Sequence, residues 1–201
     1  MLTRDSLATG LARIADHMDA VADELNALDG QLGDGDLGVT MVRGSRAVRD
    51  LLPDMPPDLG QALMQVAQAF TRTSGSSFGT LIATGLMAAS KTLKGRDAVE
   101  WSETPALLMA AFEMMRTRGK ADLGDKTVLD ALHAAATATT GLSDPADIRA
   151  AARNAVTATL DRMRDHPARI GRARIFGEKS VGLDDPGMRA LLHMIDALDP
   201  P

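Results

Sequence analysis

The chain of 201 residues contains no cysteine, and only 2% of its residues are aromatic. Without cysteine, neither a disulfide framework nor a thiolate zinc site can form. The scarcity of aromatic rings leaves almost no surface on which nucleic-acid bases could stack. A net charge of −5 also argues against a general nucleic-acid binder, which would carry a basic face. The composition therefore predicts no nucleic-acid partner.

Long apolar runs and targeting signals are missing as well. No apolar run reaches the length needed to span a bilayer. The N-terminal residues 1–5 lack the basic start and the apolar core of a signal peptide. A chain of this length can bury a core without disulfides or metals. We therefore expect a single domain, residues 1–201, a cytoplasmic location and no membrane partner.

Regular apolar spacing predicts helices along almost the whole chain. The clearest stripe runs from Leu7 to Leu28 in steps of four and three, and predicts a helix of about six turns that Asp5 or Ser6 caps. The same reasoning predicts seven more helices, around residues 41–52, 59–70, 78–91, 105–115, 128–136, 145–163 and 188–198. Alternating runs of β-branched and aromatic residues are missing, so no strands are predicted. The expected fold class is all-α.

Three carboxylates, Asp29, Asp34 and Asp36, are interleaved with four glycines in the stretch that ends at Gly38. Anions gathered so closely repel one another, so a fold that holds them together commonly holds a cation between them. Hard oxygen ligands on a turning loop suit Mg²⁺. The alternative is a polar loop with solvated aspartates. A calcium EF-hand is excluded because its twelfth position, counted from Asp34, is Ser45 rather than Glu.

Two further loops have features of phosphate sites. Gly75-Ser76-Ser77 precedes a predicted helix, whose free N–H groups and dipole favour a phosphate. Serine and glycine are also ordinary capping residues, so the motif alone is weak. Arg172 and Arg174 lie in a long glycine-containing stretch before the last helix, where they could hold phosphate oxygens or form a solvated basic turn.

Residues 119–127 nearly match the P-loop pattern that ends in Gly-Lys-Thr. Asp125 is inserted between Gly124 and Lys126, and no strand is predicted before the loop. Both departures argue against a P-loop. We expect instead that Asp125 caps the following helix and that Lys126 is solvated or paired.

Together these segments resemble, in order and spacing, the nucleotide-binding L subunit of dihydroxyacetone kinase. The matching segments are Asp29-x4-Asp34-x-Asp36, Gly75-Ser76-Ser77, Arg118-Gly119-Lys120, Gly124-Asp125-Lys126-Thr127, Gly171-Arg172-Ala173, Gly177-Glu178-Lys179-Ser180-Val181-Gly182 and Asp185-Pro186-Gly187. The resemblance covers nearly the whole chain. It implies a barrel of eight antiparallel helices with the nucleotide and two Mg²⁺ ions at one end.

The resemblance also implies a role for individual residues. Asp29, Asp34 and Asp36 would bind Mg²⁺. The residues implied to contact ADP or ATP are Leu37, Gly38, Val39, Thr40, Ser76, Ser77, Gly119, Val128, Arg172, Asp185, Pro186 and Gly187. Two of them depart from the family pattern, which typically has His where Leu37 stands and Asn where Thr40 stands. These two changes bear on nucleotide affinity or identity.

The activity implied is that of the L component of a two-part kinase. A phosphoryl group would pass from the nucleotide to dihydroxyacetone, or a related small keto-sugar, on a separate K-type subunit, and Mg²⁺ would neutralise the phosphate oxygens. The phosphoryl source is either ATP that exchanges freely or bound ADP that a phosphotransferase system rephosphorylates. Catalytic residues beyond the metal site are not expected, because the histidines have the setting of surface or core residues (His17, His133, His166 and His193).

An alternative function on the same fold is a non-catalytic, nucleotide-dependent interaction or regulatory protein. Intact metal ligands combined with altered nucleotide contacts would suit such a protein too. We also expect the chain to form a homodimer.

Overall fold

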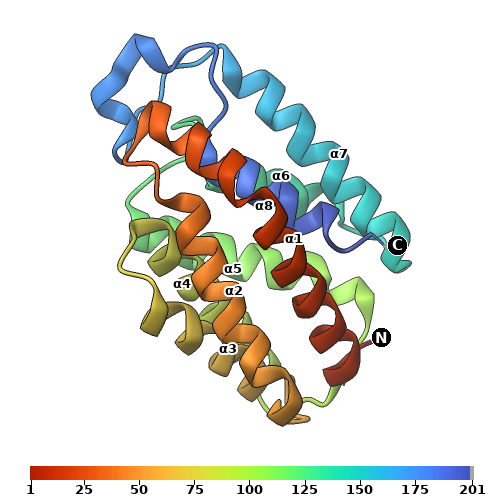
Figure 1. Ribbon diagram of the computed structural model, residues 1–201. Coiled ribbons are helices and arrows are strands. Elements are labelled where there is room, and N and C mark those ends of the chain that lie inside the picture. The colour runs from red at the N-terminus through yellow and green to blue at the C-terminus, as the bar shows by residue number, and fades with distance from the viewer. Residues whose placement is uncertain (200–201) are drawn as a thin grey trace.

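Eight α-helices form the framework of residues 1–199, the part of the chain described by the computed structural model (Figure 1). They are α1 (Arg4–Leu32), α2 (Leu37–Leu51), α3 (Leu59–Thr73), α4 (Ser77–Leu93), α5 (Thr104–Gly119), α6 (Val128–Ala138), α7 (Pro145–Arg164) and α8 (Pro186–Asp196). Three short 3₁₀ helices are η1 (Leu52–Asp54), η2 (Trp101–Glu103) and η3 (Ala173–Ser180). Residues 200 and 201, the last two of the predicted domain, lie outside the described part. The predicted all-α class is confirmed.

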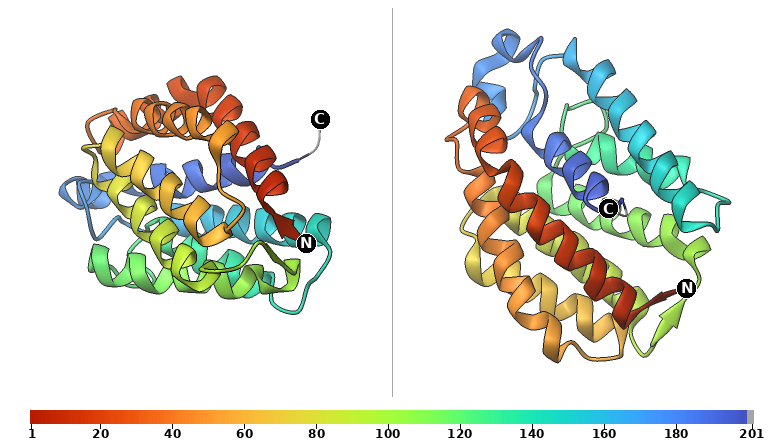
Figure 2. Two further views of the ribbon diagram at one scale, coloured as in Figure 1. Left: turned by 90° about the horizontal axis from the view of Figure 1, so that it is seen from below. Right: turned by 45° about the vertical axis from the view of Figure 1, so that its right-hand side comes forward.

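The helices close into a ring. Each α-helix packs against the next one along the chain, and α8 packs against α1. Successive helices run in opposite directions, as the two views of Figure 2 show. This is the predicted antiparallel barrel. As a consequence, α2, α4, α6 and α8 all begin at the same end of the molecule.

Apolar side chains fill the space between the helices. Met18, Met41 and Met188 are completely buried, and the flexible methionine side chain suits such core positions. The largest apolar cluster joins α1, α2, α3, α4 and α8. No helix within residues 1–199 is both long and apolar enough to cross a bilayer.

The first helix is longer than predicted. Thr3, not Asp5 or Ser6, occupies the N-cap position, and Ser6 completes a capping box by accepting a hydrogen bond from the Thr3 N–H at 2.8 Å. At its other end α1 continues through Asp29 to Leu32, which is only 2% exposed. Burial of Leu32 outweighs the roughly 1 kcal/mol by which a glycine in the last turns disfavours the helix. The first aspartate of the acidic stretch is therefore helical.

The prediction that the chain has no strands is wrong at one place. β1 (Leu2–Thr3) and β2 (Ala98–Val99) form a two-stranded antiparallel pair, with Leu2 opposite Val99. Strands of two residues are too short for an alternating pattern to be recognised in the sequence. The pair joins the start of α1 to the α4–α5 connection.

Candidate functional site

A cleft of about 280 Å³ lies where four helices begin. The first residue of each of these helices lines it: Leu37 of α2, Ser77 of α4, Val128 of α6 and Pro186 of α8. The first N–H groups of a helix have no partner within the helix, and they carry the positive end of its dipole. Four such ends around one cleft favour an anion, and phosphate groups suit this environment.

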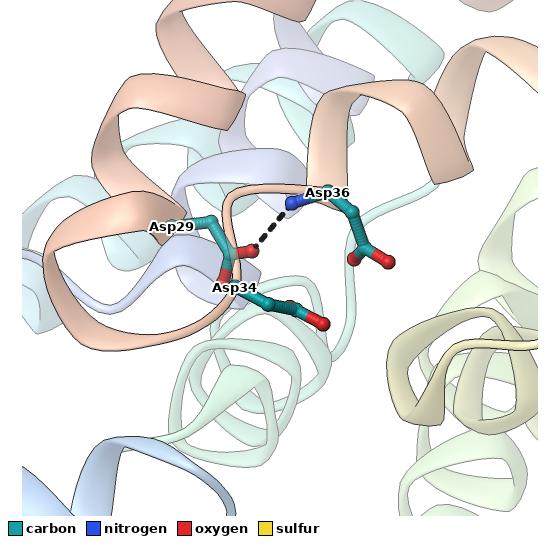
Figure 3. A group of neighbouring side chains, drawn as sticks. All are labelled: Asp29, Asp34 and Asp36. Carbon is teal, nitrogen blue, oxygen red and sulfur yellow. Dashed lines mark hydrogen bonds between the residues drawn. The ribbon is translucent and has the colours of Figure 1, made fainter.

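Three aspartates converge at the cleft from the α1–α2 junction (Figure 3). Asp29 lies on the last turn of α1, Asp34 in the connection, and Asp36 at the N-cap position of α2. One carboxylate oxygen of each lies within 4.8 Å of the others, and the Asp36 N–H donates to Asp29 Oδ2 at 3.0 Å. An all-oxygen set open to water fits Mg²⁺, which fills its remaining positions with water and phosphate.

The turn between the two later aspartates depends on Gly35. Its φ of 74° lies in the left-handed region, which glycine adopts without the steric cost that a Cβ atom would add. The turn brings Asp36 back to within hydrogen-bonding distance of Asp29. Gly35 therefore shapes the carboxylate cluster directly.

An ion pair crosses the cleft between Arg172 and Asp34. It joins the α7–α8 connection, residues 165–185, to the acidic stretch. Because the two side chains are 58% and 45% exposed, the pair contributes little to stability. The guanidinium can instead turn to a bound phosphate, to which it can donate two hydrogen bonds at once.

The serine loop presents a capped helix N-terminus to the cleft. Ser76 is the N-cap of α4, and its Oγ accepts a hydrogen bond from the Gly79 N–H at 3.0 Å. Ser74 Oγ lies 3.0 Å from Ser76 Oγ and also accepts the Ser76 N–H at 3.2 Å. Ser76 and Ser77 both line the cleft, and their contact with phosphate stays a prediction.

The loop before α6 differs from the prediction at two residues. Thr127, not Asp125, is the N-cap of α6, in a capping box completed by Asp130. Asp125 instead accepts a hydrogen bond from the Asp122 N–H at 2.8 Å. Lys126 is neither solvated nor paired with a carboxylate, because it is 1% exposed and donates to main-chain carbonyls. Asp125 lies two residues before this N-cap, too early in the chain to cap the helix.

Asp185 caps α8 and lines the cleft. Its Oδ1 accepts the Met188 N–H at 2.8 Å. Burial raises the pKa of Asp185 to about 7, although this hydrogen bond and the nearby Lys126 ammonium both favour the charged carboxylate. The protonation state of this residue therefore changes near neutral pH.

One wall of the cleft is apolar. Phe78 and Leu81 of α4, Val128 and Leu129 of α6 and Ile170 of the α7–α8 connection line it. They belong to the same apolar cluster. Such a wall suits the flat ring of a nucleobase. Apart from Val128, sequence reasoning missed these residues, because those of α4 and α6 have the spacing of ordinary core positions and Ile170 lies outside the helices.

The structure brings nine of the twelve predicted nucleotide-contacting residues into the cleft with the three aspartates. The nine are Leu37, Ser76, Ser77, Gly119, Val128, Arg172, Asp185, Pro186 and Gly187. Leu37 is 5% exposed and belongs to the largest apolar cluster. The position where the family typically has histidine is therefore filled here by a core-packed side chain at the edge of the cleft.

Gly38, Val39 and Thr40 do not line the cleft, and their contact with the nucleotide stays a prediction. They follow Leu37 in the first turn of α2, where each residue turns about 100° from the last. Gly38 faces α1, since a Cβ atom there would lie 2.0 Å from the Ala22 carbonyl oxygen. Thr40 is buried and Val39 is exposed.

Comparison with known proteins relates the chain to a family of kinases and their subunits. It matches the DAK2 domain family model over residues 31–199. The ADP-binding subunit DhaL of the PEP-dependent dihydroxyacetone kinase of Escherichia coli (strain K12) is 29% identical, over 98% of this chain and 96% of that relative. The triokinase/FMN cyclase of Homo sapiens is 32% identical, over 96% of this chain and 34% of that relative.

A crystal structure with the same fold is that of the dihydroxyacetone kinase from C. freundii in complex with AMP-PNP and Mg²⁺. It is 27% identical in sequence and superposes with a TM-score of 0.74, over 96% of this chain and 33% of that one. The chain thus spans about a third of this kinase and of the human relative, and nearly all of the E. coli subunit.

Proposed function

The chain belongs to the DAK2 domain family, and from that membership we propose that it is the nucleotide- and Mg²⁺-binding component of a two-part kinase. The substrate is dihydroxyacetone or a related small keto-sugar, held on a separate K-type subunit. One observation carries the proposal: four helix N-termini and three converging aspartates line a single cleft. Near full-length similarity to a subunit named for ADP binding supports it.

The cleft offers a place for each part of a nucleotide. Asp29, Asp34 and Asp36 hold Mg²⁺ beside the phosphates, because their oxygens are of the type that this ion prefers. The start of α4, at Ser76 and Ser77, receives phosphate oxygens. The base packs on the apolar wall, which includes Phe78 and Leu81 of the same helix.

This chain orients the phosphates and stabilises their charge. When bound, Mg²⁺ neutralises charge that develops on the phosphate oxygens in a loose transition state. Arg172 adds a guanidinium from the α7–α8 connection, and helix N-termini supply further positive partial charge without having to move. The apolar wall excludes water from the base.

A base that activates the substrate hydroxyl comes from the partner subunit. Among the residues that line the cleft there is no histidine. His17 and His193 pair with each other at 3.2 Å, and neither they nor the other two histidines border the cleft. Half of the active site therefore belongs to the K-type subunit.

Reconstitution tests the proposal. The purified chain, a K-type subunit, dihydroxyacetone, Mg²⁺ and ATP are expected to give a phosphorylated product only when both proteins are present. Replacement of ATP by a phosphotransferase system with ADP distinguishes the two phosphoryl sources. Robust turnover by the chain alone would refute the two-part assignment.

A regulatory, non-catalytic role is the second candidate. The observation that favours it is Leu37, which places a buried apolar side chain where the family typically has a polar one. Nucleotide binding without turnover, in the presence of every tested K-type subunit and phosphoryl source, would support it. The expected homodimer stays a prediction, which sedimentation of the purified chain can test.

A further inference from the structure

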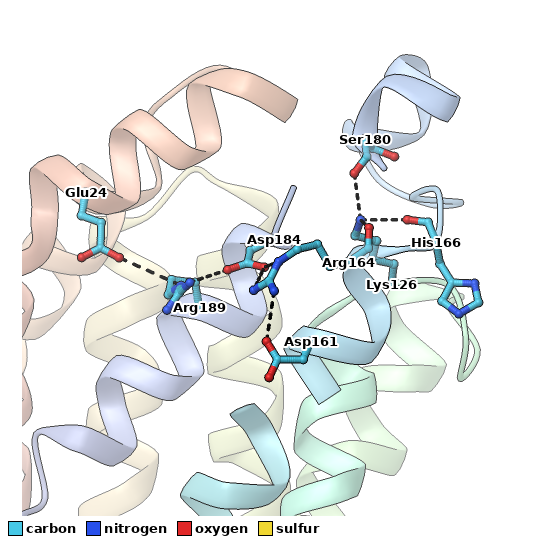
Figure 4. A network of polar contacts seen from close by, with 8 residues as sticks. All are labelled: Glu24, Lys126, Asp161, Arg164, His166, Ser180, Asp184 and Arg189. Carbon is cyan, nitrogen blue, oxygen red and sulfur yellow. Dashed lines mark hydrogen bonds and ion pairs between the residues drawn. The ribbon is translucent and has the colours of Figure 1, made fainter. Parts of the chain in front are cut away.

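Lys126 is a completely buried lysine that bonds only to main-chain oxygens. Its Nζ donates to the carbonyl oxygens of His166 and Ser180, both at 2.8 Å, and to that of Arg164 at 3.4 Å (Figure 4). The side chain is 1% exposed. Burying an ammonium group disfavours its charged form, and burial lowers the pKa of Lys126 accordingly. The three carbonyls accept hydrogen bonds from the ammonium group and offset part of this cost.

These bonds use all the hydrogen-bonding capacity of the ammonium group. A lysine has three N–H donors and no acceptor, and each donor has a carbonyl partner. Although Lys126 borders the cleft, it has no donor left for a phosphate. Its role therefore differs from that of the P-loop lysine, which reaches the phosphates of the nucleotide.

The three carbonyls lie at or near the two ends of the α7–α8 connection, residues 165–185. Arg164 and His166 flank the point where the chain leaves α7, and Ser180 ends η3. Between these ends the connection contributes Arg172 and three neighbouring residues to the cleft. One ammonium group thus fastens both ends of a cleft-forming segment to the loop before α6.

Other contacts join the same segments. The Arg164–Asp184 ion pair at 2.8 Å links the two ends, and the Arg169 N–H donates to the Asp125 carbonyl at 3.1 Å. Ser180 Oγ accepts the Ala168 N–H at 2.8 Å, and the Gly182 N–H donates to the Arg164 carbonyl at 2.8 Å. The last two bonds each involve a residue whose carbonyl Lys126 also binds. Loss of the ammonium group would therefore leave buried carbonyls unpaired and loosen these contacts locally.

We propose that Lys126 is a positioning residue: its ammonium group holds the α7–α8 connection in the conformation that places Arg172 at the cleft, and does not itself touch the nucleotide. The effect on nucleotide binding rests on the proposed function. The fastening of residues 165–185 by Lys126 does not depend on that function.

Hydrogen exchange of the full chain without nucleotide tests the fastening. Lys126→Met keeps most of the side-chain volume and removes the ammonium group. It is expected to speed exchange of the Ala168 and Gly182 amides at least about tenfold, while amides of α1 to α4 keep their rates. Trypsin is expected to cleave the variant faster after Arg172 and Arg174.

Lys120→Met is the matched control, because Lys120 is an exposed lysine on the same loop, also at positive φ, 51°. It is expected to leave exchange and cleavage unchanged. If Lys126→Met does not fold, Lys126→Gln, which keeps two N–H donors, is measured in the same way. Unchanged exchange in the connection, or an equal rise over the whole chain, would overturn the proposal.

The rate at which the protein releases ADP in the presence of Mg²⁺ tests whether the fastening by Lys126 matters for nucleotide binding. Lys126→Met is expected to release ADP about tenfold faster than the unaltered chain. Slower binding or faster release with no change in exchange would mean that the ammonium group contacts the nucleotide, which also overturns the proposal. If the unaltered chain binds no ADP, the proposed function fails, while the exchange measurement still decides whether Lys126 fastens the connection.

Discussion

Replacing Asp185 with asparagine should change how stability depends on pH. Burial raises the pKa of Asp185 from its ordinary 3.8 to about 7 in the folded chain, so the folded state keeps a proton that the unfolded state has lost. This contribution to stability is fully present below 3.8 and is lost as the pH rises through about 7. Asparagine does not titrate and can still accept the Met188 N–H.

The size of the effect follows from the displaced pKa. Between about pH 5 and the folded-state pKa of about 7, only the unfolded state has lost the proton. Stability therefore falls by about 1.4 kcal/mol for each of these two pH units, so a rise from about pH 5 to about pH 8 removes at most about 3 kcal/mol. Asp185 lines a cleft, where water stabilises the charged form. We therefore expect the unaltered chain to lose about 1–3 kcal/mol more than Asp185→Asn over this range.

Urea unfolding of both proteins at several pH values measures the difference. Asp144→Asn provides the control, since Asp144 caps α7 through the Ala146 and Asp147 N–H groups but is exposed. The control should follow the unaltered chain at every pH. Parallel stability curves for Asp185→Asn and the unaltered chain would refute the reasoning.

Two further substitutions separate binding from packing. Arg172→Ala should leave the free energy of unfolding within about 0.5 kcal/mol and weaken ADP binding about 10- to 150-fold, the worth of a charged hydrogen bond. The neighbouring Arg174→Ala should change neither the free energy of unfolding nor the ADP affinity, and equal ADP affinities of the two variants would contradict the role of Arg172. Gly38→Ala should lower the unfolding free energy by about 1–3 kcal/mol, because the added Cβ would lie 2.0 Å from the Ala22 carbonyl oxygen. Gly75→Ala, where nothing lies within 4 Å, should change stability little, and equal urea midpoints for the two variants would contradict this account of Gly38.

The helices could be predicted from the sequence because most of them bury one apolar stripe. Residues such as Leu59 and Val66, which are almost completely buried, recur at helical spacing and locate their helix. Helix ends were less predictable. The apolar stripe ends at Leu28, so it predicts Asp29 to lie in a loop, whereas the burial of Leu32 extends α1 past Asp29.

The site could be predicted only in part. The Asp29, Asp34 and Asp36 cluster is local, so its spacing already indicated a cation site. Convergence of four helix N-termini depends on closure of the ring between α1 and α8, which local spacing does not reveal. The role of Lys126 was also hidden, since its partners His166 and Ser180 lie 40 and 54 residues away.

Calorimetric titration with ADP tests the central claim, that the cleft binds a nucleotide through Mg²⁺ held by the three aspartates. The unaltered chain is predicted to bind ADP in Mg²⁺ and to lose most of this affinity in EDTA. Asp36→Asn should bind weakly even in Mg²⁺, whereas Asp50→Asn, an exposed aspartate near the far end of α2, should bind normally. Equal ADP affinity in Mg²⁺ and in EDTA would contradict the account.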